Sequence, residues 1–143
     1  MKKALHLTLL FALFITVANA QTDKYWSANA ESRSNIPTTK AVSRLSFPKE
    51  FKLYNLNIGA LRQELFSIVG RNASSHSTVI SLPTPTGKIE QFEVFEASNF
   101  EPALQDRFPE IRAYSGRGIS DKYATLKLSI SPQGIQTMIF RVD

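Results

Sequence analysis

The amino-acid sequence predicts an α+β fold, in which a mainly antiparallel sheet carries two short helices packed on one face. Three observations lead to this fold class. Short segments alternate between apolar and polar residues, turns rich in Gly and Pro separate them, and only two stretches have apolar residues at helical spacing. We see no internal repeat and no coiled-coil heptads. All the main predicted strands and helices fall within residues 47–143, which we interpret as one domain.

The first twenty residues have the three-part pattern of a secretory signal peptide. A short positive region, Met1-Lys2-Lys3, precedes the apolar residues 4–17 and a small-residue site that predicts cleavage between Ala20 and Gln21. The apolar run is shorter than the roughly 20 residues that span a bilayer, and the chain has no cysteine to carry a lipid. We therefore expect a secreted or periplasmic protein of 143 − 20 = 123 residues, without stable membrane association after cleavage.

Residues 21–46 are polar and aperiodic, and we interpret them as a leader or linker. Such a composition buries too little apolar surface to offset the entropy lost on ordering. Tyr25 and Trp26 are large enough to dock on the domain all the same. Because the sequence stops shortly after a predicted strand, with no polar tail and no terminal helix, we expect the domain at 47–143 to be truncated at its C-terminus.

The first half of the domain is predicted as a strand, a capped helix and a second strand. Residues 51–57 are typical of a strand, Asn57 is a suitable N-cap, and Gly70 ends the helix. After a polar loop, residues 78–82 form a β-branched strand, and the two prolines and the glycine of 83–87 require a turn. The helix is indicated by the spacing of Ile58, Leu61, Leu65, Ile68 and Val69.

The second half is predicted as a strand, a short helix and three further strands. Residues 88–96 complete a hairpin and carry Phe92 and Val94 on one face. A helix of about two turns is indicated by Phe100, Leu104 and Phe108, with Pro109 after it. The last three strands are predicted at 111–115, 124–131 and 135–140, with turns at Gly116-Arg117-Gly118 and at Pro132-Gln133-Gly134.

Charge and cysteine content argue against several classes of function. The chain has 17 basic and 12 acidic residues; removal of Lys2 and Lys3 leaves 15 against 12, a net charge of +3. No stripe of basic residues occurs, so we expect no nucleic-acid partner. Without cysteine the exported chain has no disulfide framework and no thiolate chemistry, and its stability must come from apolar burial.

The residues that usually perform catalysis are missing, and we predict no catalytic, cofactor-binding or metal-binding residue in this segment. His76 is the only histidine after the signal peptide, and no His-Glu-x-x-His spacing occurs. His76 has serine neighbours in Ser74-Ser75-His76-Ser77, but adjacent loop residues rarely reach the geometry of a catalytic triad. We interpret it as a solvated loop histidine.

Four weaker patterns also have structural explanations. Glu90, Glu93 and Glu96 suggest a carboxylate pair, yet along a strand Glu93 points away from the other two. Gly116-Arg117-Gly118 lacks the strand-to-helix context of a phosphate loop and is interpreted as a turn. Asn72-Ala73-Ser74 matches a glycosylation acceptor, which matters only in a host that modifies it. The aromatic residues Tyr25, Trp26, Tyr114 and Tyr123 are candidates for a sugar- or peptide-binding surface or for core packing.

Several short motifs follow one another in a fixed order over most of the mature chain. They are Trp26; Phe51, Leu53, Leu61 and Leu65; Ile80-Ser81-Leu82-Pro83 with Thr86-Gly87; Phe92 to Ser98; Leu104 with Phe108-Pro109-Glu110-Ile111; Tyr114 to Ile119; and Ser131-Pro132-Gln133-Gly134. Together they resemble the N-terminal propeptide region of secreted reprolysin-like (metzincin) zinc metallopeptidases of Bacteroidetes-type bacteria. The chain departs from this pattern at Ile135-Gln136, where an aromatic residue and a histidine are expected.

The resemblance implies a non-catalytic domain that assists the folding of a downstream protease domain in cis or shields its cleft. Zinc is implied only for that downstream domain. Tethering makes such an association intramolecular, so a weak interface is sufficient. Two alternatives remain open: a secreted binding module, free-standing or appended to another enzyme, that recognises glycan or peptide, and an independent enzyme, which the missing catalytic residues disfavour.

Overall fold

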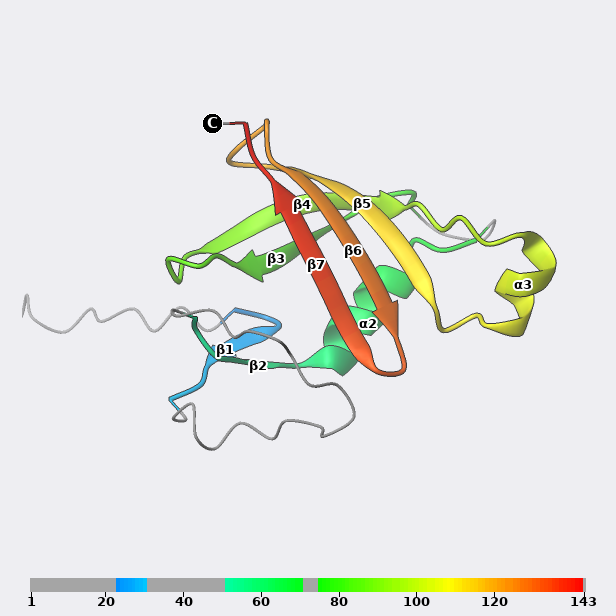
Figure 1. Cartoon of the computed structure of the whole chain (residues 1–143), viewed down its shortest axis with the longest axis horizontal. Coiled ribbons are helices and arrows are strands. Elements are labelled where there is room, and N and C mark those ends of the chain that lie inside the picture. Colours follow the sequence, from blue (N-terminus) through cyan, green and yellow to red (C-terminus); the bar gives the residue numbers. More distant parts are fainter. Residues whose placement is uncertain (1–22, 31–50, 71–74, 143) are drawn as a thin grey trace, which may run out of the picture.

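The computed structural model describes residues 23–30, 51–70 and 75–142, and its main feature is a curled antiparallel sheet of five strands (Figure 1). The strands lie in chain order, β3-β4-β5-β6-β7, and a separate two-stranded sheet joins β1 and β2. The elements are β1 Trp26–Ala28, β2 Tyr54–Leu56, α2 Ile58–Phe66, β3 Thr78–Pro83, β4 Ile89–Glu96, α3 Pro102–Arg107, β5 Arg112–Gly118, β6 Thr125–Ser131 and β7 Gly134–Phe140.

Helix α2 begins where the sequence predicts. The Asn57 side chain accepts a hydrogen bond from the backbone N–H of Ala60 at 3.1 Å, which satisfies one of the free donors at the helix start. The helix ends at Phe66, earlier than the apolar spacing suggests, because the Ser67 N–H bonds the carbonyls of both Gln63 and Glu64. The chain then turns away at a glycine of positive φ, Gly70.

The core lies between α2 and one face of the five-stranded sheet. Leu61 and Leu65 of α2 are fully buried, and in β6 the buried residues Leu126, Leu128 and Ile130 alternate with exposed ones. The Tyr114 hydroxyl of β5 donates a hydrogen bond to the Leu65 carbonyl at 3.2 Å. The pKa of Tyr114 is raised, chiefly by burial. This tyrosine therefore ties the sheet to the end of the helix.

Both predicted hairpins are confirmed. β3 pairs with β4 across a turn in which the Thr84 N–H bonds the Lys88 carbonyl at 2.8 Å and Gly87 takes a φ of +92°. β6 pairs with β7 across Pro132-Gln133, and Gly134 has a φ of +132°. Positive φ favours glycine, so these two residues explain why the chain reverses at these points.

The predicted α+β class is wrong, because the fold is mainly β. Of the described residues, 43% are in strands and 16% in helices. Of the two helices in the described residues, only α2 covers the sheet; α3 forms near the predicted place, but none of its residues is buried. In Figure 1, α3 lies beyond the end of the sheet, in the connection between β4 and β5. The apolar spacing correctly predicts that α3 is a helix, but it does not predict whether the helix packs on the sheet. α3 does not pack there because α2 already occupies that face.

The segment predicted as a leader includes part of the fold. Within 21–46 the structure describes residues 23–30, where β1 pairs antiparallel with β2. Tyr25 is only 4% exposed and belongs to the core, and Trp26 packs partly against it. These two residues dock on the domain, as their size allows. The predicted signal peptide at 1–20 and residues 31–46 lie outside the described residues.

Candidate functional site

The three glutamates of β4 each have a partner of their own. Glu90 pairs with Arg141, and Glu96 pairs with Arg112 at 2.7 Å between Oε1 and Nη1. Glu93 lies on the opposite face, as predicted, and accepts a hydrogen bond from the Ser77 hydroxyl at 3.0 Å. Because Glu90 and Glu96 are at opposite ends of the strand, the arrangement is not the carboxylate pair of a glycosidase.

His76 lies exposed in the loop before β3. Its serine neighbours donate their hydroxyl hydrogens to other groups. The Ser75 hydroxyl donates to the Ser77 carbonyl at 2.6 Å, and the Ser77 hydroxyl donates to Glu93 of β4. Among the described residues, no three His, Cys, Asp or Glu side chains gather closely enough to hold a metal ion. The acceptor motif at Asn72 and the predicted cleavage site at Ala20 and Gln21 lie outside those residues.

The sequence predicts a turn at Gly116-Arg117-Gly118, and this prediction is wrong, because the three residues form the end of β5. All three pair with β4, and Gly116 and Arg117 also pair with β6. The glycines are needed for space: a Cβ on Gly116 would lie 2.8 Å from Val94 Cγ1, and one on Gly118 would lie 2.2 Å from the Asp121 carbonyl oxygen. Sequence alone does not distinguish glycines that allow close packing from glycines that turn the chain.

The four candidate aromatic residues do not form one binding surface. Tyr25 and Tyr114 are buried in the core, and Trp26 is half-buried with its ring edge-on to Tyr54, at 6.4 Å between ring centroids. Tyr123 alone is largely exposed, at 77%. Core packing therefore accounts for two of the four, and only Tyr123 is available to a partner.

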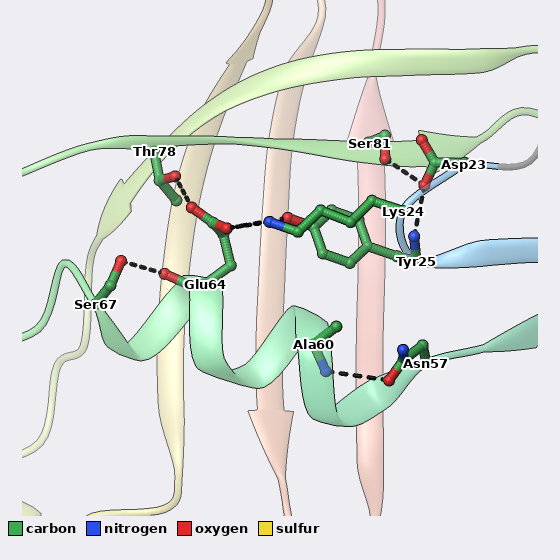
Figure 2. Close-up of polar contacts among 9 residues, drawn as sticks. All are labelled: Asp23, Lys24, Tyr25, Asn57, Ala60, Glu64, Ser67, Thr78 and Ser81. Atoms are coloured by element: carbon green, nitrogen blue, oxygen red, sulfur yellow. Dashed lines mark hydrogen bonds and ion pairs between the residues drawn. The ribbon is translucent and has the colours of Figure 1, made fainter.

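Glu64 of α2 is the centre of a polar cluster that joins the N-terminal segment to the domain (Figure 2). Its Oε2 accepts the Lys24 ammonium at 2.6 Å and the Tyr25 hydroxyl at 3.3 Å. Its Oε1 accepts the Thr78 hydroxyl of β3 at 2.5 Å. One carboxylate thus binds three elements together, and we call Glu64, Lys24, Tyr25 and Thr78 the Glu64 cluster.

Asp23 and Trp26 attach the same segment to the edge of β3. Asp23 Oδ1 accepts hydrogen bonds from the Tyr25 N–H at 2.9 Å and from the Ser81 hydroxyl at 2.6 Å. The Trp26 indole N–H donates to the Ser81 carbonyl at 2.7 Å. A polar pocket of about 380 Å³ lies between residues 23–25, Glu64 and β3. Its polar groups are bonded mainly to each other, so we assign it a structural role.

The charge of the Glu64 cluster makes it sensitive to pH. The ammonium of Lys24, followed by the Thr78 hydroxyl, lowers the pKa of Glu64, and the same pairing raises the pKa of Lys24. A carboxyl whose pKa is lower in the folded state stabilises the fold above its unfolded pKa of about 4.3. That contribution is lost as the pH falls through the folded pKa.

We expect Glu64→Gln to lower the free energy of unfolding by about 1 kcal/mol at pH 7. The difference from the wild-type protein should shrink as the pH falls from the unfolded pKa of about 4.3 through the lower folded pKa, because the wild-type carboxyl becomes protonated over that range. Urea unfolding of both proteins at a series of pH values measures the difference at pH 7 and its change with pH. Asp106→Asn, at an exposed position of α3, is the control and should have little effect. An equal effect of Glu64→Gln at every pH would contradict the ionic explanation.

A second feature lies where the described chain leaves β7. Arg141 donates to Asp121 in the β5–β6 connection at 2.9 Å and also pairs with Glu90, which raises the pKa of Arg141. Figure 1 shows that connection beside the end of β7. Three apolar side chains in the two stretches of chain that this ion pair joins are exposed. We call them the C-terminal corner: Ile119 at 44%, Tyr123 at 77% and Val142 at 77% exposed.

The sequence did not point to either feature. In the sequence Glu64 is one of several polar residues of a predicted helix. Its partners Lys24 and Thr78 are 40 and 14 residues away, so no local pattern indicates the contacts. The C-terminal corner brings together residues from two separated stretches of chain. Tyr123 is the one residue of the corner that the sequence analysis names as a candidate for a binding surface.

No family model, curated protein or solved structure matches this chain. Among the described residues, no helix is long and apolar enough to cross a membrane.

Proposed function

We propose that this chain is the non-catalytic propeptide or N-terminal domain of a secreted zinc metallopeptidase, which assists the folding of the downstream protease domain or sterically inhibits it. The C-terminal corner is the observation that supports the proposal. A domain joined after Asp143 would follow the Arg141–Asp121 ion pair in the chain, and the two stretches that this pair joins carry three exposed apolar side chains, Ile119, Tyr123 and Val142. Exposed apolar side chains that lie together are typical of contact surfaces.

The ion pairs of Arg141 give this contact a defined direction. Because Arg141 is bonded to both Glu90 and Asp121, the chain leaves β7 at a fixed point rather than swinging freely. A partner in cis is therefore presented to the corner at high effective concentration, and a small apolar surface is sufficient to hold it. With no thiol in the chain, inhibition would be steric and would not use a cysteine on zinc.

The first test is to read the coding sequence beyond codon 143. We expect an in-frame zinc-protease motif of the form His-Glu-x-x-His-x-x-Gly-x-x-His. A stop codon directly after codon 143 would overturn the proposal and favour a secreted binding module for peptide or glycan.

The corner itself can be tested in the longer precursor. The double variant Tyr123→Ser, Val142→Ser should weaken the contact between the two domains, because central aromatic contacts dominate binding. The intact, unprocessed precursor should then cleave casein about tenfold faster than the wild-type precursor. Leu104→Ser, at an exposed apolar position of α3, is the matched control and should leave the precursor latent. Equal latency in all three proteins would rule out the corner as the contact.

A further inference from the structure

The two edges of the five-stranded sheet differ in how they are protected. Edge strand β3 ends at Pro83 and carries the N-terminal segment along it, where Trp26 donates to the Ser81 carbonyl and Asp23 accepts from the Ser81 hydroxyl. These are features that keep an edge from pairing with another chain. β3 is therefore closed to a further strand around Ser81.

Edge strand β7 has none of these features. Within the described chain it pairs only with β6, and its seven residues include no proline and no charged side chain. Met138 is 60% and Phe140 51% exposed, on the face of the sheet away from α2. Alternate residues of an edge strand turn their backbone N–H and C=O groups outward, so β7 offers unused hydrogen-bonding groups beside exposed apolar ones.

We propose that β7 pairs with β7 of a second copy of this chain, antiparallel about a two-fold axis at Thr137, so that two five-stranded sheets join into one. The inference is independent of the proposed propeptide function, because it uses the backbone edge of 134–140 rather than the C-terminal corner.

The sequence of β7 is complementary to itself in this register. Pairing about Thr137 places Ile135 opposite Ile139 of the second copy and Thr137 opposite its own counterpart, and both kinds of pair are favourable. On the outer face Met138 meets Gln136, and Phe140 covers Gly134, where an aromatic ring shields a glycine backbone. All seven residues are paired only when the axis lies at Thr137.

Charge also permits self-pairing. The two strands meet without like charges, and Arg141 at the end of the strand is already paired with Glu90 and Asp121 of its own chain. A single pair of strands covers less than the roughly 1,200 Å² of a stable complex. We therefore expect a weak dimer, with a dissociation constant on the order of 100 µM.

Sedimentation velocity of the full chain after signal-peptide removal tests this from about 5 to about 500 µM, a range that brackets the expected constant. The wild-type protein should shift from monomer to dimer. Thr137→Lys places two ammonium groups opposite each other across the axis and should keep the protein mainly monomeric over this range, through a loss of affinity of at least about tenfold. Thr137 is exposed in the monomer, so the variant should still fold. The control, Ser129→Lys, adds the same charge at an exposed position of the neighbouring strand β6 and should dimerise like the wild type.

The absence of cysteine allows a second test that reports the register. Thr137→Cys introduces the single thiol of the chain at the axis, where opposite Cβ atoms lie about 5 Å apart and within reach of a disulfide after small shifts. Mild oxidation should convert it to a covalent dimer. In Ser129→Cys the two thiols lie three strand spacings of about 4.8 Å apart and should not join.

A wild-type chain that remains monomeric at every concentration would overturn the inference. Dimerisation that Thr137→Lys leaves unchanged, or equal cross-linking of the two cysteine variants, would place the interface elsewhere and overturn it as well.

Discussion

Gly118→Ala is expected to lower the free energy of unfolding by about 3 kcal/mol, although it adds a single methyl group. A Cβ at this position would lie 2.2 Å from the Asp121 carbonyl oxygen and 3.1 Å from Ala124 Cβ. The carbonyl cannot easily move, because it accepts the Ala124 N–H at 3.0 Å, and the Gly118 N–H in turn bonds the Ala124 carbonyl. Relief of the clash must break this tight connection between β5 and β6.

Chemical unfolding followed by circular dichroism measures the effect. The matched control is Gly59→Ala in α2, where an added Cβ meets only Asn57 Oδ1 at 3.7 Å. Because alanine favours a helix over glycine, that variant should gain about 0.5 to 1 kcal/mol. A Gly118→Ala protein as stable as the wild type would show that the β5–β6 connection has room to move.

The same substitution bears on the C-terminal corner. Asp121 holds Arg141, and Ile119 and Tyr123 flank it in the connection that Gly118 begins. Displacement of Asp121 should therefore also release the end of β7. In the proposed precursor, Gly118→Ala should weaken latency together with stability, whereas Tyr123→Ser with Val142→Ser should affect latency alone.

Local signals were sufficient to predict the two hairpins of the sheet, β3 with β4 and β6 with β7. Strands β4 and β6 alternate between buried and exposed residues, and the hairpin turns contain glycines at positions that need positive φ, as at Gly87 and Gly134. The strands of each hairpin are antiparallel neighbours joined by a short turn, so their pairing can be predicted without long-range information. What failed was the role of α3, because the spacing of Phe100, Leu104 and Phe108 reports a helical face but not whether a sheet is free to receive it.

The candidate sites were harder to predict because they are non-local. Glu64 takes its partners from β3 and from the N-terminal segment, which composition alone assigned to a leader. Two aromatic residues, Tyr25 and Trp26, were the exception to that composition, and they are the residues that dock. A few large side chains can thus fix a segment whose average composition suggests disorder.

Tyr25→Ala should be the second severe substitution, with a loss of about 3 kcal/mol. Tyr25 is 4% exposed in the core, its carbonyl accepts the Asn57 N–H at 2.8 Å, and its hydroxyl donates to Glu64. Removal of the ring leaves a cavity between α2 and the N-terminal segment and should free residues 23–28 from the domain.

Tyr25→Phe separates the ring from the hydroxyl. Because the hydroxyl bond to Glu64 is long, at 3.3 Å, its loss should cost no more than about 1 kcal/mol, and most of the stability should remain. Unfolding in urea gives the free energies, and hydrogen exchange at the Asn57 amide, which bonds the Tyr25 carbonyl, reports detachment of the segment. The amide should exchange rapidly in Tyr25→Ala and remain protected in Tyr25→Phe. Rapid exchange of the Asn57 amide already in the wild-type protein would contradict this prediction. It would mean that the Tyr25 ring does not hold residues 23–28 on the domain and that β1 contributes little to the stability of the fold.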